Sequence, residues 1–351
     1  MTKVKSYLQI TNSNGQCDGT GAQVQRIISL AAYARFIRIK FAFYPISQIE
    51  IQHGDKFKSE GEVLEFLDKL NRFLSDIFVP MNGSEKKVSK YSREFYIKPN
   101  AFNLFFAIPI IGLFASLLKV NIRLFLSDAY AFTRIFPNSY LKIFEKYQIV
   151  GGLRSAQLDV QVHIRFSTIS LQSDRHVPSA YYLEWLDFLR EFASVNNFTI
   201  KLLIHTDCEV GEYNDVLITK YLTSETSAYW RAIGVTDEND NPKSSTITSY
   251  KALIEAIQII YPDVVITNSL SPLSAWRIMS TSDIILTSKS SFSFVGALLA
   301  KSAIVISPDM EIKNPGCWIE GMPSSEHARQ KFISSFMQKT NSISKMKTFR
   351  C

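Results

Sequence analysis

The stretch Asp283-Ile-Ile-Leu-Thr-Ser-Lys-Ser-Ser-Phe-Ser-Phe-Val-Gly-Ala-Leu-Leu299 predicts a buried strand, a hydroxyl-rich turn and a helix in close succession. A helix that starts near Phe292 would point its unpaired backbone N–H groups and the positive end of its dipole into the turn. A helix end of this kind binds anions such as phosphate, although serine also favours helix starts for capping alone. The turn carries five hydroxyls, on Thr287, Ser288, Ser290, Ser291 and Ser293. We therefore predict a phosphate-binding turn.

Strand-like and helix-like segments alternate on both sides of this turn, over residues 151–351. Strands are predicted at Leu158–Arg165, Thr199–His205, Val264–Thr267, Ile284–Thr287 and Ala303–Ser307. Helices are predicted at Ser179–Ala193, Thr248–Ile259, Ser271–Met279 and Phe292–Ala300. This rhythm predicts an α/β fold with a doubly wound parallel sheet. In such sheets ligands bind beyond the carboxyl ends of the strands.

The first 150 residues follow a less regular pattern. Strands are predicted at Tyr7–Ile10 and Ile39–Tyr44, with a helix between them at Ala22–Ile37. A second helix, Glu62–Ile77, is strongly amphipathic, and Ser59 stands at the spacing of a capping box before it. Because 351 residues exceed a typical single core, we predict two domains, residues 1–150 and 151–351.

The amino-acid composition indicates which classes of ligand the protein binds. A net charge of +7 and a pI near 9.0 favour anionic ligands, and the absence of an arginine-rich block disfavours nucleic acid. The four cysteines form no C-x-x-C pair, so neither a zinc site nor a disulfide framework is expected. The amino-terminal residues lack the apolar run of a signal peptide, and a cytoplasmic location is expected.

The segment Ala101–Leu118 is uncharged and is bounded by Lys98 and Lys119. Its length is at the lower limit for a transmembrane helix, and Pro109 and Gly112 interrupt it. A buried helix pair, or a helix that rests on a membrane face, is therefore favoured over a true span. A peripheral membrane contact remains an expectation.

Candidate site residues lie at strand ends and at glycine turns. His163 and Arg165 are two residues apart at a strand end, so both side chains are expected on one face, where the arginine fork suits a diphosphate. Asp207 follows the next strand and could hold a ribose or cap a segment. In Asp18-Gly-Thr-Gly-Ala-Gln23, Gly19 and Gly21 would let the backbone approach a ligand closely. The chain contains no Asp-x-Asp pair, so we expect no metal ion and no cofactor.

These motifs resemble those of fucosyltransferase-type glycosyltransferases, the α-1,2-, α-1,6- and protein O-fucosyltransferase superfamily with its bacterial and viral relatives. The resemblance covers the glycine turn that ends in Gln23, the pair His163 and Arg165, and the run Ser290-Ser-Phe-Ser293. Phe166, Ser167 and Thr168 depart from the second Arg, the Gly and the Asp of that family's donor motif. The resemblance implies the GT-B architecture, in which two Rossmann-like domains face each other across a cleft, with an acceptor-side domain first and a donor domain second.

The resemblance implies transfer of a sugar from a nucleoside-diphosphate donor to a glycan hydroxyl. The sugar is fucose by family default, and the reaction would be inverting and independent of metal ions. The donor would contact Gly19, Gly21, His163, Arg165, Asp207, Ser288, Ser290, Ser291, Phe292 and Ser293. The acceptor would contact Gln23, His53 and Asp55, and Arg165 would stabilise the leaving group. Asp18 is the first candidate base, and His53 or Asp55 is the second. One alternative is a transferase of another sugar, such as xylose from a UDP donor. The other is a degenerate, non-catalytic module that binds a sugar or a nucleotide.

Overall fold

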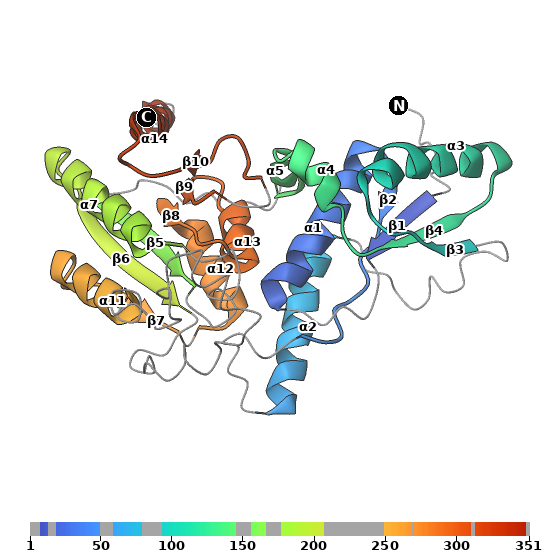
Figure 1. Cartoon of the computed structure of the whole chain (residues 1–351), viewed down its shortest axis with the longest axis horizontal. Helices are drawn as coiled ribbons and strands as arrows, with labels where there is room; N and C mark the ends of the chain where they lie inside the picture. Colours follow the sequence, from blue (N-terminus) through green and yellow to red (C-terminus); the bar gives the residue numbers. More distant parts are fainter. Residues whose placement is uncertain are drawn as a thin grey trace, which may run out of the picture. The chain divides into compact units, whose positions relative to one another are not determined.

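The computed structural model describes residues 8–12, 19–49, 59–78, 93–144, 156–165, 177–206, 249–268, 270–309 and 313–348. The chain divides into two compact units (Figure 1). Unit 1 comprises Met1–Gln148 and Glu311–Cys317, and unit 2 comprises Ile149–Met310 and Trp318–Cys351. Residues 313–317 therefore pack with unit 1, although they lie far along the chain. The predicted α/β class is confirmed, with a parallel sheet in each unit.

Unit 1 is built on a four-stranded parallel sheet in the order β2-β1-β4-β3. Its strands are β1 (Leu8–Asn12), β2 (Lys40–Phe41), β3 (Arg93–Tyr96) and β4 (Ile122–Leu126). Its helices are α1 (Thr20–Phe36), α2 (Glu60–Ile77), the π-helical η2 (Asn103–Ala107), α3 (Ile108–Leu118), α4 (Tyr130–Ile135) and α5 (Ser139–Phe144). The Ser59 hydroxyl accepts from the Glu62 N–H at 3.3 Å, as the capping-box spacing predicts.

Strands β3 and β4 form the part of this sheet that the sequence did not predict. Arg123 is the second residue of β4 and is only 6% exposed. Its guanidinium donates to the Glu94 carboxylate on β3 at 2.9 Å and to the Gln9 side chain on β1 at 3.0 Å. Because both partners lie on adjacent strands, the sheet accommodates a nearly buried charge.

The segment 101–118 forms one continuous helix across the predicted interruption at Pro109. The Ile108 N–H donates to the Asn103 carbonyl five residues back, in the π-helical pattern. The next donor in this pattern, toward the Leu104 carbonyl, would be residue 109, where proline has no N–H. The Tyr33 hydroxyl on α1 donates to the Leu104 carbonyl instead. Among the residues described, no helix combines the length and apolarity needed to cross a bilayer.

Unit 2 is built on a six-stranded sheet in the order β10-β9-β8-β5-β6-β7, in which all pairs are parallel. Its strands are β5 (Gln157–Ile164), β6 (Thr199–Thr206), β7 (Val265–Thr267), β8 (Ile284–Leu286), β9 (Ile304–Ser307) and β10 (Ile319–Glu320). Its helices are α7 (Ser179–Val195), α11 (Ser249–Ile260), α12 (Pro272–Thr281), α13 (Ser291–Leu299) and α14 (Glu326–Thr348). Numbered along the unit, this order is the 3-2-1-4-5-6 of a doubly wound sheet.

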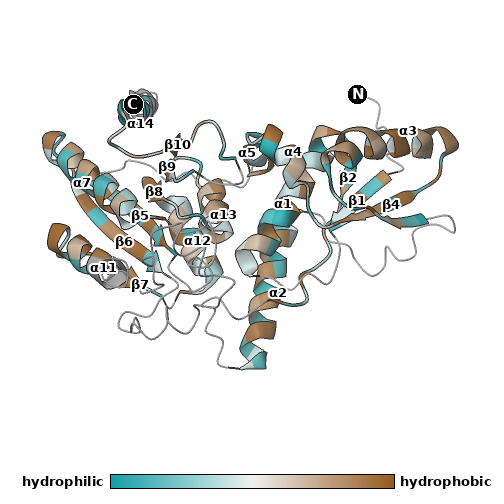
Figure 2. Cartoon of the chain, in the orientation of Figure 1, coloured by the Kyte–Doolittle hydropathy of each residue, from teal (hydrophilic) through white to brown (hydrophobic). Residues whose placement is uncertain are grey.

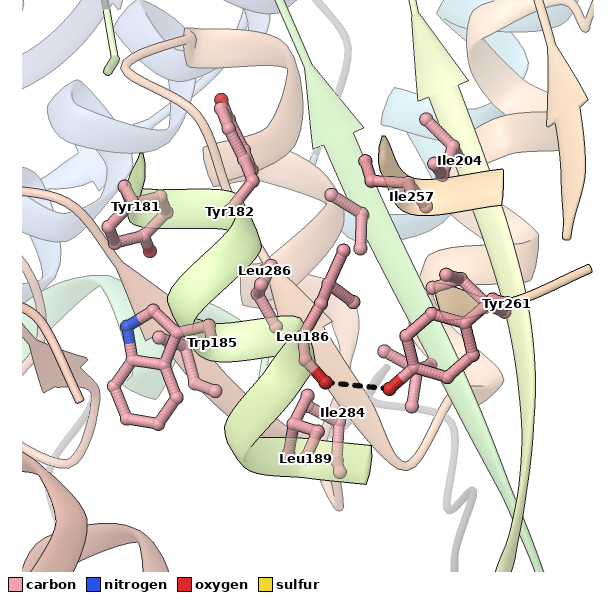
Figure 3. Close-up of a cluster of buried hydrophobic side chains, with 14 of the residues drawn as sticks. Tyr181, Tyr182, Trp185, Leu186, Leu189, Ile204, Ile257, Tyr261, Ile284 and Leu286 are labelled. Carbon is pink, nitrogen blue, oxygen red and sulfur yellow. Dashed lines mark hydrogen bonds between the residues drawn. The ribbon is translucent and has the colours of Figure 1, made fainter. Parts of the chain in front are cut away.

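Helices cover both faces of the unit 2 sheet, with α7 and α11 on one face and α12 and α13 on the other (Figure 1). The core under α7 contains Trp185, Leu186 and Leu189, packed against Ile204, Ile284 and Leu286 of the strands (Figure 3). The Tyr261 hydroxyl donates to the Leu186 carbonyl at 2.7 Å, which joins the end of α11 to α7. The buried ring of Tyr261 therefore keeps its polar atom satisfied.

We expect Tyr33→Phe to destabilise unit 1 by about 1–3 kcal/mol, because the buried Leu104 carbonyl loses the donor that replaces the missing proline N–H. Hydrogen–deuterium exchange of the peptide that contains residues 101–118 measures this loss locally. Tyr96→Phe is the matched control, since the Tyr96 side chain is 74% exposed. Equal protection in the two variants would show that the hydroxyl does not stabilise the π-helical turn.

Candidate functional site

The candidate site lies where strand order reverses in the unit 2 sheet. Strands β5 and β8 are neighbours, but the chain continues from β5 to β6 on one side and from β8 to β9 on the other. The connections that leave their carboxyl ends diverge, and ligands bind at this point in doubly wound sheets. His163 and Arg165 lie at the end of β5, and the serine turn 287–290 follows β8. The two predicted motifs thus lie at the same edge of the sheet.

Two side-chain contacts connect these strand ends. His163 Nδ1 lies 2.7 Å from the Ser288 hydroxyl oxygen. Arg165 donates from Nη1 to the Ser290 hydroxyl oxygen at 3.2 Å. His163 and Arg165 therefore contact the same turn, as expected for residues two apart on a strand.

The serine hydroxyls are largely used within the turn itself. Ser290 is the N-cap of α13, and its side chain accepts from the Phe292 N–H at 3.3 Å. The Ser293 hydroxyl accepts from the Ser288 N–H at 3.3 Å and lies 3.1 Å from the Ser290 carbonyl. Ser288, Ser290 and Ser293 are all buried. These hydroxyls fix the shape of the turn, which leaves backbone N–H groups of the first turn of α13 as the expected anion donors.

Two further side chains of the turn reach its surface. Ser291 and Lys289 are each half-buried. Sequence reasoning did not single out Lys289, although a cation inside a hydroxyl-rich turn was a signal for an anion site. Together with Arg165 it gives the turn a positive charge, which adds to the dipole of α13.

A cluster of tilted aromatic rings packs beside the turn. The Phe292 ring lies 5.0 Å from the His163 ring and 5.7 Å from the Trp276 ring. The Trp276 indole N–H donates to the Phe292 carbonyl at 2.9 Å. A Cβ at Gly296 would lie 2.5 Å from the Met279 sulfur and 3.1 Å from a ring carbon of Trp276, so α13 packs closely against α12 at this glycine. The start of α13 is therefore held firmly against α12.

A second buried histidine lies beside His163. In the register of β5 and β6, His163 pairs with His205, whose Nε2 is 2.9 Å from the Gln161 side-chain oxygen. Burial holds the pKa of His163 well below its ordinary 6.5, and the neighbouring His205 and Arg165 add to this effect. Burial alone lowers the pKa of His205 to about 4. Both histidine rings are therefore neutral at pH 7. The sequence analysis assigned no role to Gln161, which contacts His205.

In unit 1, the predicted glycine turn leads into α1. Gly19 is the N-cap of α1 in an extended conformation, with φ −61°. Gly21 is buried in the first turn of the helix. The Gln23 amide donates to the Gln48 carbonyl at 2.7 Å. These positions stay candidates for ligand contact, as predicted.

Four predicted residues lie outside the described residues: Asp18, His53, Asp55 and Asp207. Their roles as base, acceptor contact and donor contact stay predictions. Over the part of the chain that the structure describes, no group of three His, Cys, Asp or Glu side chains could hold a metal ion.

No protein-family model matches the sequence, and no curated protein matches it. Among solved structures, the chain is similar to POFUT1 in complex with GDP, with a TM-score of 0.42 and 12% identity over 88% of this chain and 98% of that one. POFUT1 in complex with GDP-fucose gives 0.42 and 13%, over 88% and 99%. E. coli heptosyltransferase WaaC with ADP gives 0.38 and 10%, over 95% and 98%.

We expect His205→Asn to reduce the acid sensitivity of unit 2. Because the folded pKa lies near 4 and the unfolded pKa near 6.5, the unfolded chain binds the proton first, and stability falls as the pH drops below about 6.5. Between pH 7 and pH 5 this group costs about 2 kcal/mol of unfolding free energy.

Denaturant unfolding followed by tryptophan fluorescence measures the effect, since all four tryptophans lie in residues 149–351. The exposed His327 on α14 provides the control variant His327→Asn, which should keep the wild-type pH dependence. An unchanged pH slope in His205→Asn would contradict the neutral, buried state of this ring.

Proposed function

We propose that this protein is a glycosyltransferase that uses a nucleoside-diphosphate sugar and binds the donor diphosphate at the strand-order reversal of unit 2. The supporting observation is the contact of Arg165 with Ser290, which places a guanidinium beside the N-terminus of α13. A guanidinium fork and a helix N-terminus are complementary to the same diphosphate. The resemblance of the Ser290–Ser293 run to the fucosyltransferase motif also supports this assignment.

The proposed chemistry depends on charge that develops on the leaving diphosphate. The acceptor oxygen bonds to the anomeric carbon of the sugar and its proton passes to the base, while the bond from that carbon to the β-phosphate oxygen breaks. Negative charge then grows on the oxygens of the leaving diphosphate. Arg165, Lys289 and the dipole of α13 offer positive charge in fixed positions, which is the arrangement that stabilises such a transition state. The internal hydrogen bonds of Ser288, Ser290 and Ser293 support catalysis indirectly, because they hold these groups in place before the donor arrives.

His163 has a positioning role in this proposal. It is neutral at pH 7, so it adds no charge to the site. Its contact with Ser288 and its tilted ring contact with Phe292 fix the carboxyl end of β5 against the turn. Arg165, two residues further along, is thereby directed toward the turn.

Transfer without a metal ion is part of the proposal, since the chain has no Asp-x-Asp pair to chelate one and the cationic groups named above take over charge neutralisation. An inverting reaction needs a base at the acceptor hydroxyl, for which Asp18 is the first candidate and His53 or Asp55 the second. Gln23 and Asp55 are the proposed acceptor contacts, and Gly19, Gly21 and Asp207 further donor contacts. Fucose from GDP-fucose is the proposed donor sugar.

Two other functions are separable by experiment. A UDP-linked pentose such as xylose would replace GDP-fucose if the departures at Phe166, Ser167 and Thr168 change the donor. A non-catalytic nucleotide-binding module would bind a diphosphate and transfer nothing. Incubation with a panel of GDP, UDP and ADP sugars, with release of the free nucleotide as the readout, distinguishes all three.

We expect Arg165→Ala to weaken binding of the preferred nucleoside diphosphate by about 10- to 100-fold, the value of one charged hydrogen-bond pair. Thermal shift with GDP, UDP and ADP side by side gives the affinities. Arg165→Lys should fall between wild type and alanine, because it keeps the charge and loses the fork. Arg190→Ala, on the exposed side of α7, is the matched control.

Wild-type protein that none of the three diphosphates stabilises would overturn the donor assignment. So would an Arg165→Ala protein with wild-type affinity.

We also expect EDTA to leave the rate of donor turnover unchanged, since fixed cationic groups replace a metal in this proposal. The measurement is nucleotide release with EDTA and, separately, with added Mg²⁺ or Mn²⁺. Loss of turnover in EDTA, restored by either ion, would show that the diphosphate needs a cation.

A further inference from the structure

The helix formed by residues 101–118 exposes a row of large apolar side chains. These side chains are between 51% and 69% exposed: Phe102, Phe106, Ile110, Leu113, Phe114, Leu117 and Leu118. Their spacing of three and four residues places them on one face of the helix. We refer to these seven residues as the outer face. Figure 2 shows the apolar colouring along α3.

The opposite face of the same helix is packed into unit 1. Leu104, Ile108 and Ala115 are buried in or beside its core. A Cβ at Gly112 would lie 3.2 Å from a methyl carbon of Leu8 and 3.5 Å from one of Ile39, so the helix lies directly on β1 and the start of β2. Because this face is occupied by the protein's own core, the outer face is the part available to a partner.

An exposed helix face in water normally carries polar or charged residues. Here, no residue between Ala101 and Leu118 is charged. The apolar area also extends beyond the helix, since Phe105 contacts the exposed Phe136, which stacks on the exposed Phe36 at 5.3 Å. A continuous apolar patch of this kind marks an interaction surface.

The exposed charges that adjoin the helix and its contact with β2 are positive. They belong to Arg38, Lys40, Lys98 and Lys119. Lys98 and Lys119 lie at the two ends of the helix, and Arg38 and Lys40 flank the Ile39 that packs at Gly112. By contrast, α2 carries five acids and two cations, a net charge of −3. Positive charge is therefore concentrated next to the outer face, whereas α2 of the same unit is acidic.

We propose that the outer face is a monotopic membrane-docking surface for anionic lipid. The helix lies in the plane of the interface, its phenylalanine and leucine side chains enter the acyl region, and the surrounding cations contact lipid phosphates. The helix does not span, because its other face stays packed on β1. The positive charge selects lipid over a second copy of this chain, since an isologous dimer would bring the same cations together.

Sedimentation with vesicles tests this proposal directly. Wild-type protein should bind vesicles of phosphatidylcholine and phosphatidylglycerol in equal parts, and bind pure phosphatidylcholine at least about tenfold more weakly. The triple variant Phe106→Gln, Leu113→Gln, Leu117→Gln should lose at least about tenfold in affinity for the anionic vesicles, because three inserted apolar side chains are removed.

Matched controls separate a surface effect from misfolding. The triple variant Val195→Gln, Ile259→Gln, Met337→Gln changes exposed apolar residues of unit 2 and should bind as wild type. The double variant Lys40→Gln, Lys98→Gln should bind more weakly and with a smaller dependence on salt. Circular dichroism confirms that each variant is folded.

Three results would overturn the proposal. The first is wild-type protein that stays in the supernatant with anionic vesicles. The second is unchanged binding in the outer-face variant. The third is a wild-type dimer that the same variant converts to a monomer, which would identify a second copy as the occupant. None of these results depends on the sugar-transfer proposal.

Discussion

All parallel strands of a sheet end at the same edge, and this constraint organises unit 2. After β5 the chain goes on to β6 on one side of the sheet, and after β8 it goes on to β9 on the other side. The residues that directly follow β5 and β8 therefore lie next to each other, with no connection passing between them. The Ser290 hydroxyl joins the two, since it caps α13 and accepts from Arg165. The tilted contact of the Phe292 and Trp276 rings and the close approach at Gly296 then fix α13 against α12. The positions of His163, Arg165 and the serine turn follow from that one junction.

Sequence patterns predicted strands β5 to β9 and helices α7, α11, α12 and α13 of unit 2, because local and tertiary preferences agree there, whereas β10 and α14 were not predicted. The helices predicted at Ser179–Ala193 and Ser271–Met279 correspond to α7 and α12, and the strand at Leu158–Arg165 corresponds to β5. Strands β3 and β4 were not predicted, because β4 contains the charged Arg123 and all of β3 is exposed. Only the tertiary pairing of Arg123 with Glu94 and Gln9 makes that sequence a central strand.

The sequence predicted which strand ends carry the candidate site, but not the contacts that its side chains make. Strand periodicity placed His163 and Arg165 on one face, and sheet topology placed the serine turn beside them. The direction of each hydroxyl was not predictable, because Ser288, Ser290 and Ser293 could equally have pointed at a ligand or at the backbone of their own turn. The Gln161–His205 contact also depends on the register of β5 and β6, which spacing within one strand does not contain.

The π-helical turn at Pro109 makes two distant residues thermodynamically interdependent. Proline withholds the N–H that the Leu104 carbonyl would otherwise use, and Tyr33, on a different helix, supplies the replacement. Substitutions at positions 33 and 109 should therefore be non-additive, since restoring an amide donor at 109 would make the phenol partly redundant. Over evolutionary time, a proline at this position and a hydroxyl on α1 would be gained and lost together.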